Sequence, residues 1–76
     1  MNKIGYVIFD KEFNTYFDSY GDEVPINFAN IFDNFESAKN ELEGWDVKDN
    51  CEIHEIVKDI KILKVFKRQV EYVEES

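Results

Sequence analysis

The segment DNFESAKNELEG, residues 33–44, decides the fold class of this chain. Within it, Phe35, Ala38 and Leu42 recur at a spacing of three to four residues. That spacing places their side chains on one face of a helix, because neighbours three and four apart lie one above the other. The segment therefore predicts one amphipathic helix, with an apolar stripe that needs a sheet to cover it.

The two ends of this helix carry their own signals. Asp33 or Asn34 is suited to cap the first turn, and Glu36 places a negative charge where the helix dipole favours it. Gly44 is expected to end the helix. Trp45 follows directly, and we expect it to pack just beyond the last turn.

Three strands are expected before the helix, at residues 4–10, 15–20 and 26–32. The first of these alternates two sets of apolar side chains, which is typical of a strand. A short polar connection joins the first two strands, and short connections join antiparallel neighbours. In the third segment, Phe28 and Phe32 are expected to be core residues.

The part of the chain after the helix is less uniform in its pattern. Residues 51–57 alternate again, with Cys51 and His54 on opposite faces. Residues 56–73 fit both a β-branched-rich strand and a helical stripe, and we favour the strand. Residues 74–76 are expected to form a frayed tail.

These elements predict a single α+β domain over residues 1–73, in the order β-β-β-α-β-β. The expected architecture is an antiparallel sheet of four to five strands with one helix packed on one face. One helix cannot cover a whole sheet. Some aromatic side chains on the other face should therefore stay exposed, or be covered by a second copy or a partner.

Composition and length narrow the classes of protein. The chain has 76 residues, of which 43% are hydrophobic and 16% aromatic, so it has enough apolar material to fold unaided. Its one cysteine, Cys51, cannot form an intramolecular disulfide, which favours a reducing cytoplasm. The N-terminal residues lack the pattern of a signal peptide, and no apolar run is long enough to span a bilayer. We therefore expect a cytoplasmic protein without a membrane segment.

Charge is distributed unevenly along the chain, whose net charge is −8. Residues 10–55 contain thirteen acidic residues and three lysines, a net charge of −10. Residues 56–70 reverse the sign, with five basic residues against one acid and a net charge of +4. An acidic field repels nucleic acid and anionic membranes and attracts basic surfaces, although surplus charge also serves solubility.

The sequence offers no convincing catalytic or metal site. Cys51 and His54 have half of a zinc spacing, but the chain has no second cysteine and no second histidine. Acidic neighbours would raise the pKa of a thiol, which opposes a cysteine nucleophile. We expect a packed Cys51, a surface His54, no enzyme activity, no cofactor and no glycine-rich phosphate loop.

Two groups of residues are candidates for binding a partner. The first combines two tyrosines, expected to be exposed, with nearby acids, a composition found at interface hot spots: Asp18, Tyr20, Asp22 and Glu23, together with Tyr16. The second consists of acids on the expected helix and its flanking loops, a solvated face that could meet the lysines and arginines of a basic groove: Asp33, Glu36, Glu41, Glu43, Asp46 and Asp49.

The pattern as a whole resembles a broad class of small proteins. Residues 29–38 leading into a helix, followed by a strand at residues 51–56 in a short acidic chain, look like small accessory proteins of bacteriophages and mobile elements. These include anti-CRISPR and other anti-defence inhibitors, several of which are acidic mimics of nucleic acid. The resemblance implies a binder and inhibitor of a bacterial nucleic-acid-handling or defence protein. The alternative is a structural module that assembles with copies of itself, for example as a homodimer.

Overall fold

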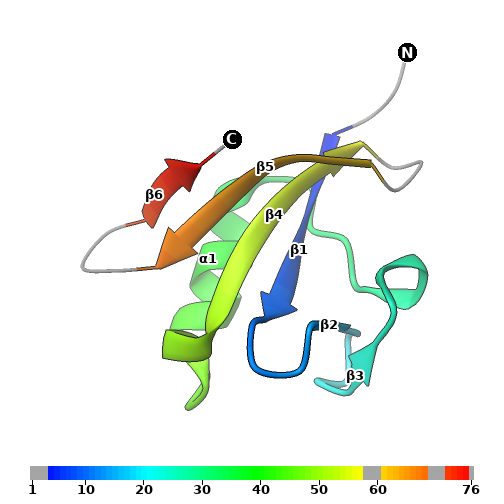
Figure 1. The fold of residues 1–76 in the computed structure, drawn as a ribbon, viewed down its shortest axis with the longest axis vertical. Coiled ribbons are helices and arrows are strands. Elements are labelled where there is room, and N and C mark those ends of the chain that lie inside the picture. The colour runs from blue at the N-terminus through cyan, green and yellow to red at the C-terminus, as the bar shows by residue number, and fades with distance from the viewer. Residues whose placement is uncertain (1–3, 58–60, 69–71, 76) are drawn as a thin grey trace.

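The computed structural model describes residues 4–57, 61–68 and 72–75. These residues form a six-stranded antiparallel sheet and one α-helix, which confirms the α+β class and adds one strand to the expected four to five (Figure 1). The elements, in chain order, are β1 (Ile4–Asp10), β2 (Thr15–Phe17), β3 (Glu23–Val24), the 3-10 turn η1 (Ile26–Phe28), α1 (Phe35–Glu43), the 3-10 turn η2 (Lys48–Asn50), β4 (Cys51–Val57), β5 (Lys61–Arg68) and β6 (Tyr72–Glu75).

The strands lie in the order β3-β2-β1-β4-β5-β6. β1 and β4 form the centre of the sheet and pair along their whole length, from Ile4 opposite Val57 to Asp10 opposite Cys51. The expected hairpin between β1 and β2 is confirmed, but it is short, because β2 ends at Phe17. The strand therefore ends three residues before Tyr20, where the sequence predicts its end.

The helix has the boundaries that its sequence predicts. Asn34 is the N-cap, and its side-chain oxygen accepts a hydrogen bond of 2.8 Å from the backbone N–H of Ser37. Gly44 ends the helix, with its N–H bonded to the carbonyl of Glu41 at 3.2 Å. Ala38 and Leu42 are fully buried against the sheet, so the predicted apolar stripe faces the core.

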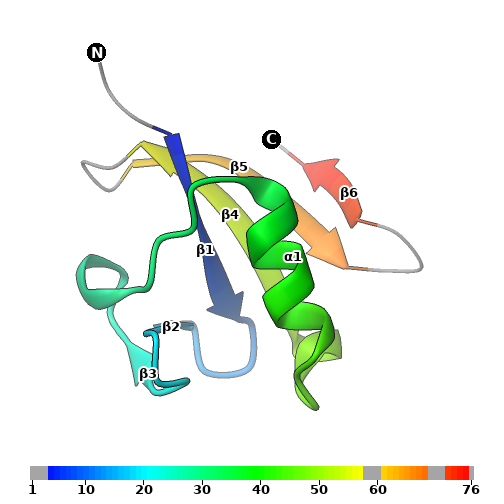
Figure 2. The ribbon, with the colours of Figure 1, turned by 180° about the vertical axis from the view of Figure 1, so that it is seen from behind.

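The sheet has apolar side chains packed on both of its faces. On one face, α1 lies across the sheet, as the view from behind shows (Figure 2). It covers a cluster that includes Ile8, Leu42 and Ile53. On the other face, Val7 and Ile56 belong to a second cluster, whose remaining members are Tyr16, Phe9, Ile26, Ala29 and Ile31. The fold therefore uses an irregular segment, rather than a second helix, to cover part of the face opposite α1.

The prediction of a strand at residues 26–32 is wrong. Its first three residues form η1, and the short strand β3 lies earlier, at Glu23–Val24. Phe28 is 67% exposed, so it is not a core residue. Phe32 makes an isolated bridge to Tyr6 through two backbone hydrogen bonds of 2.8 and 2.9 Å, and it packs against the helix-side cluster. This segment packs across one face of the sheet and does not add a strand to it. Its apolar side chains therefore do not alternate between two faces.

The C-terminal third is strand wherever the structure describes it. β5 pairs with β4 and β6, which confirms the preference for strand over helix at residues 61–68. Residues 58–60, 69–71 and 76 lie outside the described part of the chain. Glu74 and Glu75, assigned above to a frayed tail, belong to β6 and pair with Phe66 and Val65.

The described residues contain one α-helix, of nine residues, and no helix among them has the length and hydropathy to cross a membrane.

Candidate functional site

The acids predicted for the helix and its loops are at the surface. Five of them are exposed, and Glu43 is half-buried. The exposed members are Asp33, Glu36, Glu41, Asp46 and Asp49. The helix and its flanking loops thus present the negative charge that the sequence predicts there.

The helix places these acids on two flanks instead of one stripe. Glu36 and Glu43 are seven residues apart and share a flank, while Glu41 points to the other. The contacts agree with this geometry: Tyr72 of β6 donates a hydrogen bond of 2.9 Å to Glu43 Oε2, whereas Trp45 Nε1 donates one of 3.2 Å to Glu41 Oε2. The acids therefore surround the exposed side of α1, so they cover more than the one face of the prediction.

Two lysines of the basic segment are paired within the sheet. Lys64 Nζ lies 3.4 Å from Glu74 Oε1, and Lys67 Nζ lies 3.0 Å from Glu75 Oε2. The hydrogen bond to Glu75 raises the pKa of Lys67 above its usual value. Both partners belong to β6, so these two lysines do not neutralise the acids of α1.

The first predicted group lies at the turn between β2 and β3. Asp18 Oδ1 accepts hydrogen bonds of 2.9 Å from the backbone N–H groups of Tyr20 and Asp22. Gly21 has a φ of 82°, a left-handed conformation that favours glycine. Glu23 accepts a hydrogen bond from the Thr15 hydroxyl. Asp18 and Glu23 therefore organise this turn.

The two tyrosines expected in this group are separated by the turn. Tyr20 is 88% exposed, as an interface residue could be. Tyr16 is buried on the sheet face opposite α1. Tyr20 lies beyond the end of β2, so the alternation of the strand does not place the two rings on one side. The prediction that Tyr16 belongs to this patch is wrong.

A hollow of about 180 Å³ brings residues of both predicted groups together. Asp18 and Tyr20 line it from the β2–β3 turn, and Glu41 lines it from α1. Trp45 and Phe17 also line it, with ring centroids 4.9 Å apart and an edge-to-face angle of 68°. A second hollow of about 270 Å³ shares Phe17, Gly21 and Trp45 and adds Asp46 and Val47. The sequence does not reveal this junction, because its walls come from segments that meet only in the folded chain.

Cys51 and His54 lie on opposite faces of the sheet, as the alternation predicts. Cys51 is fully buried in the helix-side cluster, and burial, followed by the charge of Asp10, raises the pKa of its thiol to about 11. The thiol is therefore protonated at neutral pH. Among the described residues, no three His, Cys, Asp or Glu side chains converge as metal ligands.

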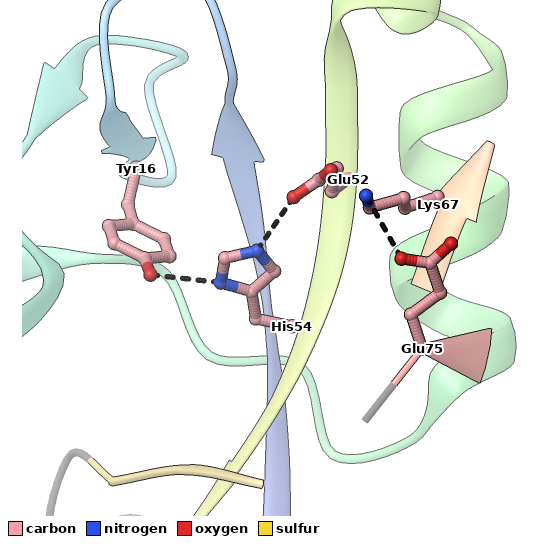
Figure 3. A network of polar contacts seen from close by, with 5 residues as sticks. All are labelled: Tyr16, Glu52, His54, Lys67 and Glu75. Atoms are coloured by element: carbon pink, nitrogen blue, oxygen red, sulfur yellow. Dashed lines mark hydrogen bonds and ion pairs between the residues drawn. The ribbon is translucent and has the colours of Figure 1, made fainter. Parts of the chain in front are cut away.

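His54 is buried, which corrects the prediction of a surface histidine. Figure 3 shows it between Tyr16 and Glu52. The Tyr16 hydroxyl lies 2.9 Å from His54 Nδ1, and His54 Nε2 lies 3.1 Å from Glu52 Oε1. A carboxylate only accepts, so Nε2 carries the proton and the Tyr16 hydroxyl donates to Nδ1. Phe9 stacks on the imidazole ring with a centroid distance of 4.7 Å.

The strand pattern of residues 51–57 carries a signal for this network. His54 shares strand parity with Ile56, which is fully buried, and with Glu52. A polar side chain at a buried position is stable when its hydrogen-bonding atoms have partners. Tyr16 and Glu52 supply those partners, and no described buried side-chain nitrogen or oxygen lacks one.

Burial makes the stability of the fold depend on the protonation of His54. Burial lowers the pKa of His54 below its usual value of 6.5, and the hydrogen bond to Glu52 opposes this shift only in part. Below about pH 6.5 the unfolded chain therefore binds more protons at this residue than the folded chain. The stability that depends on neutral His54 is complete above that pH and is lost as the pH falls toward the folded-state value.

We expect His54→Gln to show this dependence in urea denaturation measured at several pH values. At about pH 7.5 the variant should be less stable by about 1 to 3 kcal/mol, because a buried network loses part of its hydrogen bonding. Toward about pH 5 the difference should shrink, because only the wild type must protonate a buried histidine. A difference that stays constant across this range would contradict the assignment.

Comparison of the chain with protein-family models, with curated proteins and with solved structures gave no match.

Proposed function

We propose that this chain is a non-enzymatic protein-binding module that engages the basic surface of a bacterial protein. In its most specific form, the proposal is a phage-encoded cytoplasmic inhibitor that occupies the nucleic-acid-binding surface of a defence or nucleic-acid-handling protein. The partner is a protein, and the chain itself binds neither nucleic acid nor membrane. Glu36, Glu41 and Asp46 supply charge to the binding surface, and Tyr20 supplies an exposed ring.

The observation that supports this proposal most is the separation of charge within the fold. Exposed acids surround α1 and its following loop, while Lys64 and Lys67 of β5 are held by acids of β6. The exposed acids Glu36, Glu41 and Asp46 outnumber Lys39, the one basic residue of α1, so the field around the helix is negative and suits a positively charged surface. Acids that surround a convex helix can contact the lysines and arginines that otherwise hold phosphate groups.

The test is affinity capture from a bacterial lysate with the immobilised chain, at low and at high salt. We expect a captured nucleic-acid-binding protein at low salt and its loss at high salt, because exposed charge pairs are screened. Duplex DNA added to the purified complex should release the chain, since both compete for one basic surface. If DNA and the chain bind the captured protein simultaneously, mimicry of nucleic acid is excluded.

A second candidate function is self-assembly through the outer strands. Ile62 and Leu63 of β5 and Val73 of β6 are 46%, 39% and 44% exposed, so apolar surface remains at this edge of the sheet. A homodimer formed there would be held by apolar contacts. Its association, measured by sedimentation at increasing salt, would not weaken, which separates it from binding by the acids of α1.

A further inference from the structure

The hollow at Trp45 combines an aromatic wall with a negatively charged rim. Trp45 and Phe17 line it together with Phe32, and Asp18, Asn30 and Glu41 add polar groups. Its volume of about 180 Å³ is below the roughly 300 to 1,000 Å³ of sites that enclose drug-sized ligands. A space of this size suits a single side chain that protrudes from a partner.

The acidic residues that line the hollow favour an occupant with a positive charge. Asp18 and Glu41 line this hollow, and Asp46 lines the adjoining one. No Lys, Arg or His occurs among the described residues that line either hollow. The described lining residues therefore supply carboxylates but no positive charge to this space, which favours a cationic side chain.

The carboxylates at the rim retain capacity to accept hydrogen bonds. Asp18 uses Oδ1 for both backbone N–H groups of its turn, and Glu41 uses Oε2 for Trp45 Nε1. The second oxygen of each carboxylate is left to accept from a donor that enters the hollow. These internal bonds also hold the two carboxylates and the indole in place before a partner arrives, which lowers the entropy cost of binding.

Aromatic rings beside carboxylates suit a guanidinium group better than an ammonium group. The planar guanidinium stacks on indole and phenol rings, and its N–H groups donate to carboxylates in a fixed geometry. Trp45 and the exposed Tyr20 are two of the four aromatic residues that line this hollow, together with Asp18 and Glu41. An ammonium group would keep more of its hydration and stack less well.

We propose that the Trp45 hollow receives one arginine side chain of the partner protein, whose guanidinium contacts Trp45 and donates to Asp18 and Glu41. This inference rests on the proposed function and names the chemistry of its anchoring contact. It makes the hollow the specific part of an interface in which the surrounding acids supply attraction at longer range.

Trp45 is the only tryptophan of the chain, so its fluorescence reports on the hollow directly. The probe is acetyl-Gly-Arg-Gly-amide, titrated at constant ionic strength, with the citrulline peptide as a neutral control of the same shape. We expect a saturable change with the arginine peptide at millimolar concentrations, on the order expected for a single side chain. The lysine peptide should bind several-fold more weakly. Equal binding of the citrulline or the lysine peptide would overturn the proposal.

Two conservative variants test the carboxylates without removing their structural bonds. Glu41→Gln keeps an oxygen acceptor for Trp45 Nε1, and Asp18→Asn keeps an acceptor for the turn. Each should weaken binding of the arginine peptide about fivefold or more. Glu12→Gln removes the same charge from the exposed turn after β1, outside the lining of both hollows and outside the proposed binding surface, and should change binding less than twofold. Equal effects of the three variants would contradict a site at Trp45.

The two proposals fail in different ways. If the arginine peptide does not bind while a captured partner still dissociates with salt, the anchoring site is wrong and the proposed function stands. If the peptide binds but DNA does not compete with the chain for its partner, mimicry of nucleic acid is wrong and the arginine site stands.

Discussion

Replacing Leu42 by Ala is expected to lower the free energy of unfolding by about 2 to 5 kcal/mol. Leu42 is fully buried in the cluster between α1 and the sheet, so the truncation leaves a cavity where the helix contacts the strands. A domain of 76 residues has a total stability of roughly 4 to 11 kcal/mol. The substitution should therefore remove a large share of the total stability and shift the urea midpoint to a clearly lower concentration.

Leu63→Ala is the matched control, because Leu42 and Leu63 are the two leucines of the chain. Leu63 is 39% exposed on β5, so the same truncation should cost less than about 1 kcal/mol there. Urea denaturation followed by Trp45 fluorescence and by circular dichroism measures both variants. Equal losses for the two would contradict the packing of α1 described above.

The helix and the central strands were predictable from sequence because their signals are local. Asn34, the stripe of Ala38 and Leu42, and Gly44 each act within the helix itself. The alternation of residues 4–10 and 51–57 likewise reflects two strands at the centre of the sheet, where both faces are covered over much of their length. Local patterns succeed where the local preference and the tertiary environment agree.

The errors arose where tertiary contacts override the local pattern. Residues 26–32 are apolar because Ile26, Ala29 and Ile31 cover the sheet face opposite α1. Irregular backbone can cover a sheet face as well as a strand can. His54 is stable in a buried position because Tyr16 and Glu52 form hydrogen bonds with its two ring nitrogens. The polarity of the histidine side chain, taken alone, therefore predicts a surface position for His54.

The candidate site could be predicted in composition but not in geometry. The acids of α1 and the turn at Asp18 were named from the sequence, but as two separate groups. The Trp45 hollow joins them because the β2–β3 turn lies beside the C-terminal end of the helix. Such a junction depends on the path of the chain between Val24 and Phe35, which local patterns do not specify.

Reversing the charge of Glu36 and Asp46 together is expected to weaken partner binding about 10- to 100-fold. Both residues are exposed, one on α1 and the other in the loop after it, so neither substitution disturbs the core. Each change to Lys replaces an attraction with a repulsion toward a basic surface. The net charge of the chain changes from −8 to about −4, since each reversal adds two charges.

Glu74→Lys with Glu75→Lys is the control, because it changes the net charge by the same amount on β6. These two glutamates pair with Lys64 and Lys67, and neither belongs to the acids proposed to bind the partner, although β6 contacts α1 through Tyr72 and Glu43. We expect less than about threefold weakening of partner binding in this variant, with circular dichroism to show that the sheet is retained. Similar losses in both variants would mean that only total charge matters.

The salt dependence of affinity for the captured partner tests most directly whether the acids around α1 carry binding. Calorimetric titrations at several salt concentrations give the slope of log affinity against log salt for the wild type and for the Glu36/Asp46 variant. We predict a steep negative slope for the wild type and a clearly shallower one for the variant, because fewer charge contacts are screened. A flat wild-type slope, or an unchanged slope in the variant, would contradict the account.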